Sequence, residues 1–85
     1  MVITNSSFAQ KEKFDSLKRL LPSITTPKAK SILLLDIANS IYNQMPDSSI
    51  AYCRESEDLS RKNKLDVQFA YSLNCESRYL LLKGD

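Results

Sequence analysis

Two cysteines are the residues of this chain best suited to covalent chemistry. Cys53 and Cys75 lie on opposite sides of a short polar turn at residues 63–65. Helices joined by so short a turn pack antiparallel, which places the two cysteines at equal height. A disulfide is then possible if their Cα atoms lie within about 7 Å. The alternative is a pair of reduced thiols in the core, where free cysteine is commonly found.

Other reactive arrangements are missing from the sequence. The chain has no histidine and no C-x-x-C pair, which excludes the usual zinc sites. It has no glycine-rich phosphate loop and no G-x-S-x-G turn. The carboxylates of Asp36 and Glu76 are available, but no spacing marks them as a catalytic pair. We therefore expect neither catalysis nor a cofactor.

Composition limits the kinds of partner. The 85 residues suffice for one small domain. The 12 basic and 10 acidic residues are interleaved and give a net charge of +2, so there is no basic patch that would predict nucleic-acid binding. No run of 18 apolar residues is present, and we expect no membrane insertion within this segment.

The elements that position these residues are predicted to be four helices. Apolar spacing, prolines and capping residues place them at about 7–21, 27–45, 46–63 and 65–83. Phe69, Leu73, Leu80 and Leu81 form the predicted buried stripe of the last helix, and Gly84 is expected to end it in a left-handed conformation. The charged residues 54–62 predict a solvated helix face with pairs at i,i+4, such as Glu57–Arg61. The fold class is therefore all-α, built from antiparallel helical hairpins.

The amino-terminal segment is treated separately. Residues 1–9 are expected to be disordered, or to be the end of a secretory signal peptide that is cleaved after Ala9. Residues 10–85 are expected to form one helical domain.

One spacing of large and small residues occurs twice, at an interval of about 39 residues. The two sets are Leu34, Ile37, Ala38, Ile41 and Leu73, Glu76, Ser77, Leu80. Such an interval is typical of stacked helical hairpins. It predicts that the small side chains of Ala38 and Ser77 lie where two helices approach closely.

Residues 31–85 resemble the tetratricopeptide repeat family. The resemblance rests on the "AYSLN…GD" stretch at 70–85, on "PDSSIAYC" at 46–53 and on "LLDIANSIY" at 34–42. It implies about one and a half repeats of an α-solenoid, truncated at residue 85. The "DSLKRLLP" lead-in at 15–22 resembles extracytoplasmic repeat modules of bacterial sensor kinases and helix-turn-helix regulators.

The resemblance implies a function in protein or peptide binding, in a periplasmic or other extracytoplasmic location; a cytoplasmic location is the alternative. By position, it assigns groove-facing roles to Asn39, Tyr42, Asn43, Tyr71, Asn74 and Arg78, with Ile32, Leu35, Leu81 and Leu82 beside them. A homodimer is a further expected partner. Two alternatives stay open, namely a small regulator that binds nucleic acid and a purely structural dimerisation segment.

Overall fold

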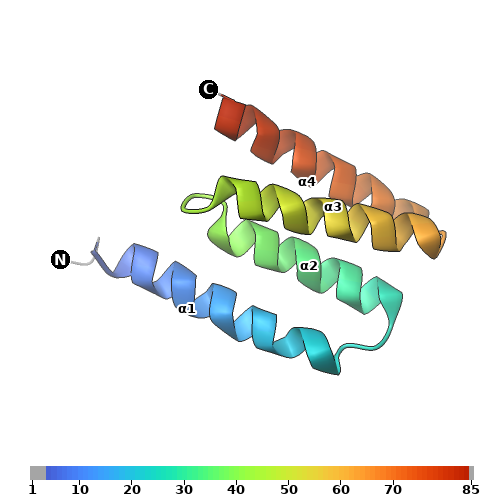
Figure 1. The fold of residues 1–85 in the computed structure, drawn as a ribbon, viewed down its shortest axis with the longest axis horizontal. Helices are drawn as coiled ribbons and strands as arrows, with labels where there is room; N and C mark the ends of the chain where they lie inside the picture. Colours follow the sequence, from blue (N-terminus) through green and yellow to red (C-terminus); the bar gives the residue numbers. More distant parts are fainter. Residues whose placement is uncertain (1–3, 85) are drawn as a thin grey trace.

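The computed structural model describes residues 4–84, which form an all-α fold of four helices without strands (Figure 1). The helices are α1 (Thr4–Leu20), α2 (Pro27–Ile41), α3 (Pro46–Lys62) and α4 (Asp66–Gly84), and a 3-10 turn, Leu21–Ser23, follows α1. Consecutive helices run in opposite directions, so α2 and α4 point the same way (Figure 1). The predicted hairpin architecture is confirmed, and no helix of residues 4–84 is long and apolar enough to cross a bilayer.

Prolines and caps set the helix starts as the sequence predicts. Pro27 opens α2 after Thr26, whose hydroxyl accepts a hydrogen bond from the Ala29 N–H at 3.3 Å. Pro46 opens α3, with Asp47 in the first turn, where the helix dipole favours an acid. Helix α1 begins at Thr4, before the predicted start near residue 7 and inside the segment 1–9 that was expected to be disordered or a signal-peptide remnant. Residues 1–3 lie outside the described part of the chain.

The connection between α3 and α4 is a Schellman motif. The Leu65 N–H donates to the Ser60 carbonyl at 2.9 Å, and the Lys64 N–H donates to the Arg61 carbonyl at 3.2 Å. Lys64 has a φ of 56°, so a lysine occupies the left-handed position that usually holds glycine. Gly84 was expected to have this conformation, but it is the last helical residue of α4 and its φ is not positive.

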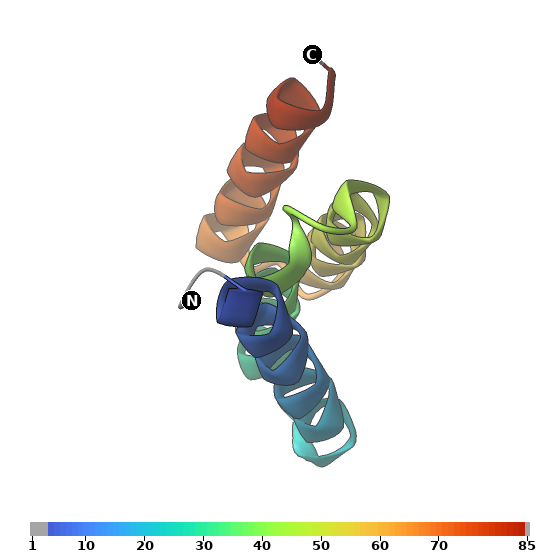
Figure 2. The ribbon, with the colours of Figure 1, turned by 90° about the vertical axis from the view of Figure 1, so that its left-hand side faces the viewer.

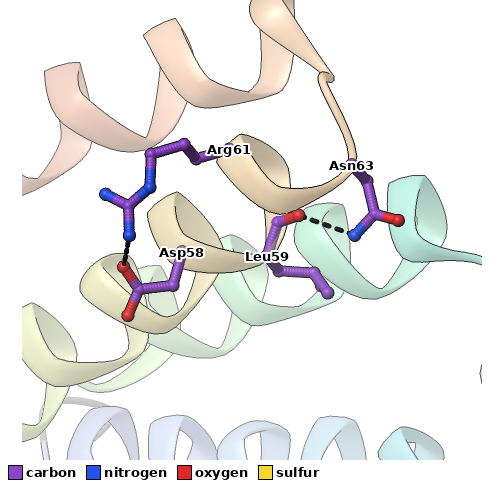
Figure 3. Close-up of polar contacts among 4 residues, drawn as sticks. All are labelled: Asp58, Leu59, Arg61 and Asn63. Carbon is purple, nitrogen blue, oxygen red and sulfur yellow. Dashed lines mark hydrogen bonds and ion pairs between the residues drawn. The ribbon is translucent and has the colours of Figure 1, made fainter.

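The charged side chains at the carboxyl-terminal end of α3 are exposed, as expected, and Figure 3 shows two polar contacts among the residues there. Arg61 pairs with Asp58 at i,i+3 over 2.9 Å, rather than with Glu57 at i,i+4. The Asn63 side-chain amide donates to the Leu59 carbonyl at 2.8 Å, and the Asn63 backbone N–H donates to the same carbonyl at 3.2 Å (Figure 3).

Helix α2 lies at the centre of the molecule. It is flanked by α1, α3 and α4 (Figure 2), which explains why its sequence is apolar around most of its circumference. Its buried residues are Ser31, Leu33, Leu34, Ile37, Ala38, Ser40 and Ile41. The core continues into Ile50 and Cys53 of α3 and Tyr79 of α4.

The prediction of which face of α4 is buried is wrong. Leu73 and Leu80 are 41% and 42% exposed, Ser77 is also exposed, and the buried residues are instead Gln68, Ser72 and Tyr79. Because α4 carries apolar residues on several sides, hydrophobicity alone does not select its buried face. The bulky Tyr79 ring lies between α4 and α2, so these helices touch only along a narrow strip.

Small side chains nevertheless mark the close helix contacts. Ala38 of α2 is fully buried as predicted, with the Ser49 hydroxyl of α3 donating to its carbonyl at 2.7 Å, and the other small residues at these contacts are serines. The Ser56 hydroxyl of α3 lies 2.6 Å from that of Ser31 on α2 and 2.8 Å from that of Ser72 on α4. Ser72 also donates to the Gln68 carbonyl at 2.8 Å. A serine therefore replaces the predicted Ser77 at the contact of α4, and its hydroxyl is satisfied within the core.

Candidate binding groove

A shallow groove follows the line between the parallel helices α2 and α4. Its central contact is made by Tyr79, whose ring stacks on the Tyr42 ring at a centroid distance of 5.2 Å. The Tyr79 hydroxyl donates to the Asn39 side-chain oxygen at 3.2 Å. Tyr79 is only 2% exposed, so the centre of this α2–α4 groove is rigidly held.

Two hollows lie along the α2–α4 groove, one toward each end of α4. The hollow toward the carboxyl end has a volume of about 300 Å³ and is lined by Tyr42, Asn43, Pro46, Tyr79, Leu82 and Lys83. The hollow toward the amino end has a volume of about 290 Å³ and is lined by Ile32, Leu35, Asp36, Gln68 and Tyr71. Both volumes suit one or two side chains of a bound segment rather than a buried cofactor.

The structure brings most of the predicted site residues to this groove. Tyr42 and Asn43 line the first hollow, and Tyr71 lines the second. Asn39 makes the contact with Tyr79 between them, and the exposed Arg78 lies over the Tyr79 ring at 5.4 Å.

Two predicted residues lie elsewhere. Asn74 lines a separate apolar hollow with Val67, Ala70 and Tyr71, and Leu81 is 73% exposed and lines neither hollow of the groove. The family resemblance assigned both residues to the groove by position. Because α4 buries Ser72 and Tyr79, Asn74 and Leu81 are exposed.

The two ends of the groove differ in charge. At the carboxyl end, Arg78 is held by the Tyr79 side chain, whose hydrogen bond raises the pKa of the guanidinium. Lys83 lines the hollow at this end and forms an ion pair with Asp47 at 2.7 Å. At the amino end, the exposed charged group is the carboxylate of Asp36. A bound segment would therefore meet cations at one end and an anion at the other.

Sequence reasoning did not identify Tyr79, Gln68 or Lys83 as groove residues. A signal for the first two exists, because Gln68, Ser72, Cys75 and Tyr79 follow one another at helical spacings of 4, 3 and 4 residues. This stripe is only weakly hydrophobic, and the adjacent leucines of α4 conceal it.

Both cysteines are free thiols in the structure. Cys53 is completely buried, and its pKa is raised to about 12, first by burial and then by the nearby Cys75. Cys75 is half-buried against the core cluster that contains Cys53, and its sulfur lies 3.9 Å from an Arg78 nitrogen. Of the two alternatives, the structure therefore has the pair of reduced thiols and not the disulfide.

The described residues contain no group of three or more cysteines, aspartates or glutamates arranged to hold a metal ion. Comparison with known proteins gives no match, whether to a protein-family model, to a curated protein or to a solved structure.

Proposed function

We propose that this chain is a non-catalytic module that binds a protein or peptide segment in the α2–α4 groove. The observation that carries the proposal is the exposure of large apolar side chains beside a fixed tyrosine pair. Ile32, Tyr71 and Leu82 are 42%, 59% and 58% exposed, and each lines one of the two hollows. Clustered apolar groups of this kind are typical of interaction sites.

Polar groups around these side chains would orient the ligand. The Asn43 amide can pair with a peptide backbone, and the Arg78 guanidinium can pair with a carboxylate in bidentate geometry. Because the Tyr42–Tyr79 stack is formed without a ligand, its ordering costs no further entropy on binding.

Two adjacent leucines provide a matched test. Peptides that bind the immobilised protein would first be selected from a display library. Their affinities for wild type, Leu82→Ala and Leu81→Ala would then be measured by fluorescence anisotropy. Leu82 lines the groove and Leu81 does not, although both are exposed. We expect at least tenfold weaker binding for Leu82→Ala and little change for Leu81→Ala. Equal binding by both variants and wild type would contradict the proposal.

The tetratricopeptide relationship is part of the same proposal. It is supported by the antiparallel hairpins and by Ser72, a buried small residue that lies 34 positions after the buried Ala38. This interval equals the length of a standard unit. The narrow contact between α2 and α4 is the main departure.

An extracytoplasmic place in a bacterial signalling protein is the corresponding proposal for location. The test is fractionation of the native host, with an antibody raised against this segment. Recovery in the periplasmic or membrane fraction would support it, whereas recovery with the cytoplasmic proteins would contradict it.

A dimerisation segment is the second candidate function. The outer face of α4, opposite its buried stripe, exposes Val67 by 68% and Leu81 by 73%, and a second copy could cover these side chains. Light scattering at two concentrations tests this role. A monomer at both concentrations would exclude it, and a dimer lost in Leu81→Ala but kept in Leu82→Ala would support it.

A further inference from the structure

Helix α4 is held against the rest of the molecule by unusually polar contacts. Two of its three buried residues, Gln68 and Ser72, are polar, and Tyr79 is the one large buried side chain among the described residues of α4. Apolar burial thus contributes less to its docking than it does for α2. A charge change at the α3–α4 interface can therefore shift the docked population of α4.

Such a charge site is formed by a pair of glutamates. Glu57 of α3 and Glu76 of α4 both lie beside Arg54, and each glutamate shifts the pKa of the other. The Glu76 side chain is only 14% exposed and pairs with the Arg54 Nε at 2.7 Å. One carboxyl oxygen of Glu57 is buried and has no hydrogen-bond partner.

The surrounding charges do not compensate two ionised carboxylates. On α3, Glu57 is acted on by the cation of Arg54 and by the anion of Asp58, and the thiol of Cys53 also lies nearby. On α4, the titratable groups on this side are Glu76, Cys75 and Arg78, and the Arg78 guanidinium contacts the Cys75 sulfur and the Tyr79 ring. The buried face of α2 is uncharged, and α1 meets α3 through the rings of Phe14 and Tyr52. The single guanidinium of Arg54 therefore interacts with the carboxyl groups of both Glu57 and Glu76.

The balance favours one proton on the pair. Burial, followed by the hydrogen bond and charge of Glu76, raises the pKa of Glu57 to about 7. Hydrogen bonds from Glu57 and Arg54 lower the pKa of Glu76 below its ordinary value. In the folded protein below neutral pH, Glu57 is thus the proton donor and Glu76 the acceptor.

We propose that a proton shared by Glu57 and Glu76 is a latch that holds α4 against α3. When the proton leaves Glu57 for solvent near neutral pH, two carboxylates face each other across the interface and α4 loosens. This inference concerns the docking of α4 and does not depend on peptide binding. It implies that the α2–α4 groove, whose second wall is α4, is most rigid in mildly acidic conditions.

The direction follows from proton linkage. The pKa of Glu57 in the folded protein, about 7, exceeds its ordinary value of 4.5. The contribution of Glu57 to stability is therefore complete below pH 4.5 and is lost as the pH rises through 7.

The test compares three proteins by thermal unfolding and by hydrogen exchange of α4 amides, corrected for intrinsic rates, between pH 5 and 8.5. Wild type should lose Tm and α4 protection as the pH rises. Glu57→Gln, which is neutral at every pH, should show a much flatter profile. Glu55→Gln, at an exposed position of the same helix, should follow wild type. A flat wild-type profile, or a Glu57→Gln profile as steep as that of wild type, would overturn the proposal.

A second measurement requires no variant. The side-chain carboxyl signals of the ¹³C-labelled protein report the titration of each glutamate directly. We expect one glutamate to titrate near pH 7 with its midpoint shared by α4 amide signals. If every glutamate titrates near its ordinary value, the latch is absent even if Glu57→Gln fails to fold.

Discussion

Replacement of Tyr79 by alanine tests the observed orientation of α4 through stability. Tyr79 is 2% exposed, stacks on Tyr42 at 5.2 Å and donates a hydrogen bond to Asn39. Truncating a buried aromatic residue of this kind costs about 3–5 kcal/mol. A domain of 85 residues has a total stability of only about 4–13 kcal/mol. Tyr79→Ala should therefore remove much of the folding free energy or release α4 altogether.

One further variant separates the contribution of the Tyr79 hydrogen bond from that of its ring, and another, at the next residue, is a control. Tyr79→Phe keeps the ring and removes only the hydrogen bond to Asn39, which should cost about 0.5–1.5 kcal/mol. Leu80→Ala changes the next residue, which is 42% exposed, and should cost about 1 kcal/mol or less. Leu80 is also the residue that the repeated spacing placed in the core, so this pair compares the two orientations of α4 directly.

The assay is urea unfolding followed by circular dichroism at 222 nm, at one fixed pH. Tyr79→Ala should lower the free energy of unfolding most, and Tyr79→Phe and Leu80→Ala should each lower it only slightly. A reduced helical signal before the main transition would indicate that α4 separates first. If Leu80→Ala destabilises the protein as much as Tyr79→Ala does, the observed face of α4 is incorrect.

Three other outcomes follow from individual contacts. Ser56→Ala removes the hydroxyl that links α2 and α4 and should lower stability by about 1–3 kcal/mol in urea unfolding, because its buried partners lose a hydrogen bond; an unchanged midpoint would contradict this. Lys64→Gly should raise stability by about 1 kcal/mol in the same assay, since glycine adopts the φ of 56° without strain. In the folded protein, one thiol should react with Ellman's reagent well before the other. Mass mapping should identify it as the half-buried Cys75, because Cys53 is buried and its pKa is about 12.

The helices themselves could be predicted from local signals. The prolines at 27 and 46, the cap at Thr26 and the scarcity of glycine each act within a few residues of the chain. The central place of α2 was equally predictable, because apolar residues surround that helix and each side must be covered by a neighbour. Such features depend on sequence spacing alone, and the structure agrees with them.

The orientation of α4 could not be obtained in this way. Its leucines at 73, 80 and 81 are more hydrophobic than Ser72 and Cys75, yet they are less buried. The decisive contacts join α4 to residues far away in the chain, such as Ser56 for Ser72 and Asn39 for Tyr79. Serine hydroxyls satisfied by other hydroxyls can lie in a core, and a hydropathy pattern does not contain that information.

Because hydropathy did not determine the buried face of α4, the predicted site residues of that helix were placed less accurately than those near α2. Asn39 of α2, and Tyr42 and Asn43 directly after α2, lie at the groove. On α4, which buries a different face from the predicted one, Tyr71 and Arg78 lie beside the groove, whereas Asn74 and Leu81 do not line it. The Glu57–Glu76 pair could not be predicted from the sequence either, because it depends on how α3 packs against α4.

Amide chemical-shift mapping of the ¹⁵N-labelled protein with a library-selected peptide locates the binding surface residue by residue. If the space between α2 and α4 is the binding site, the largest shifts should fall on Tyr42, Asn43, Tyr71 and Leu82. Shifts concentrated instead on α1, or on the solvated end of α3 around Asp58 and Lys62, would contradict the account.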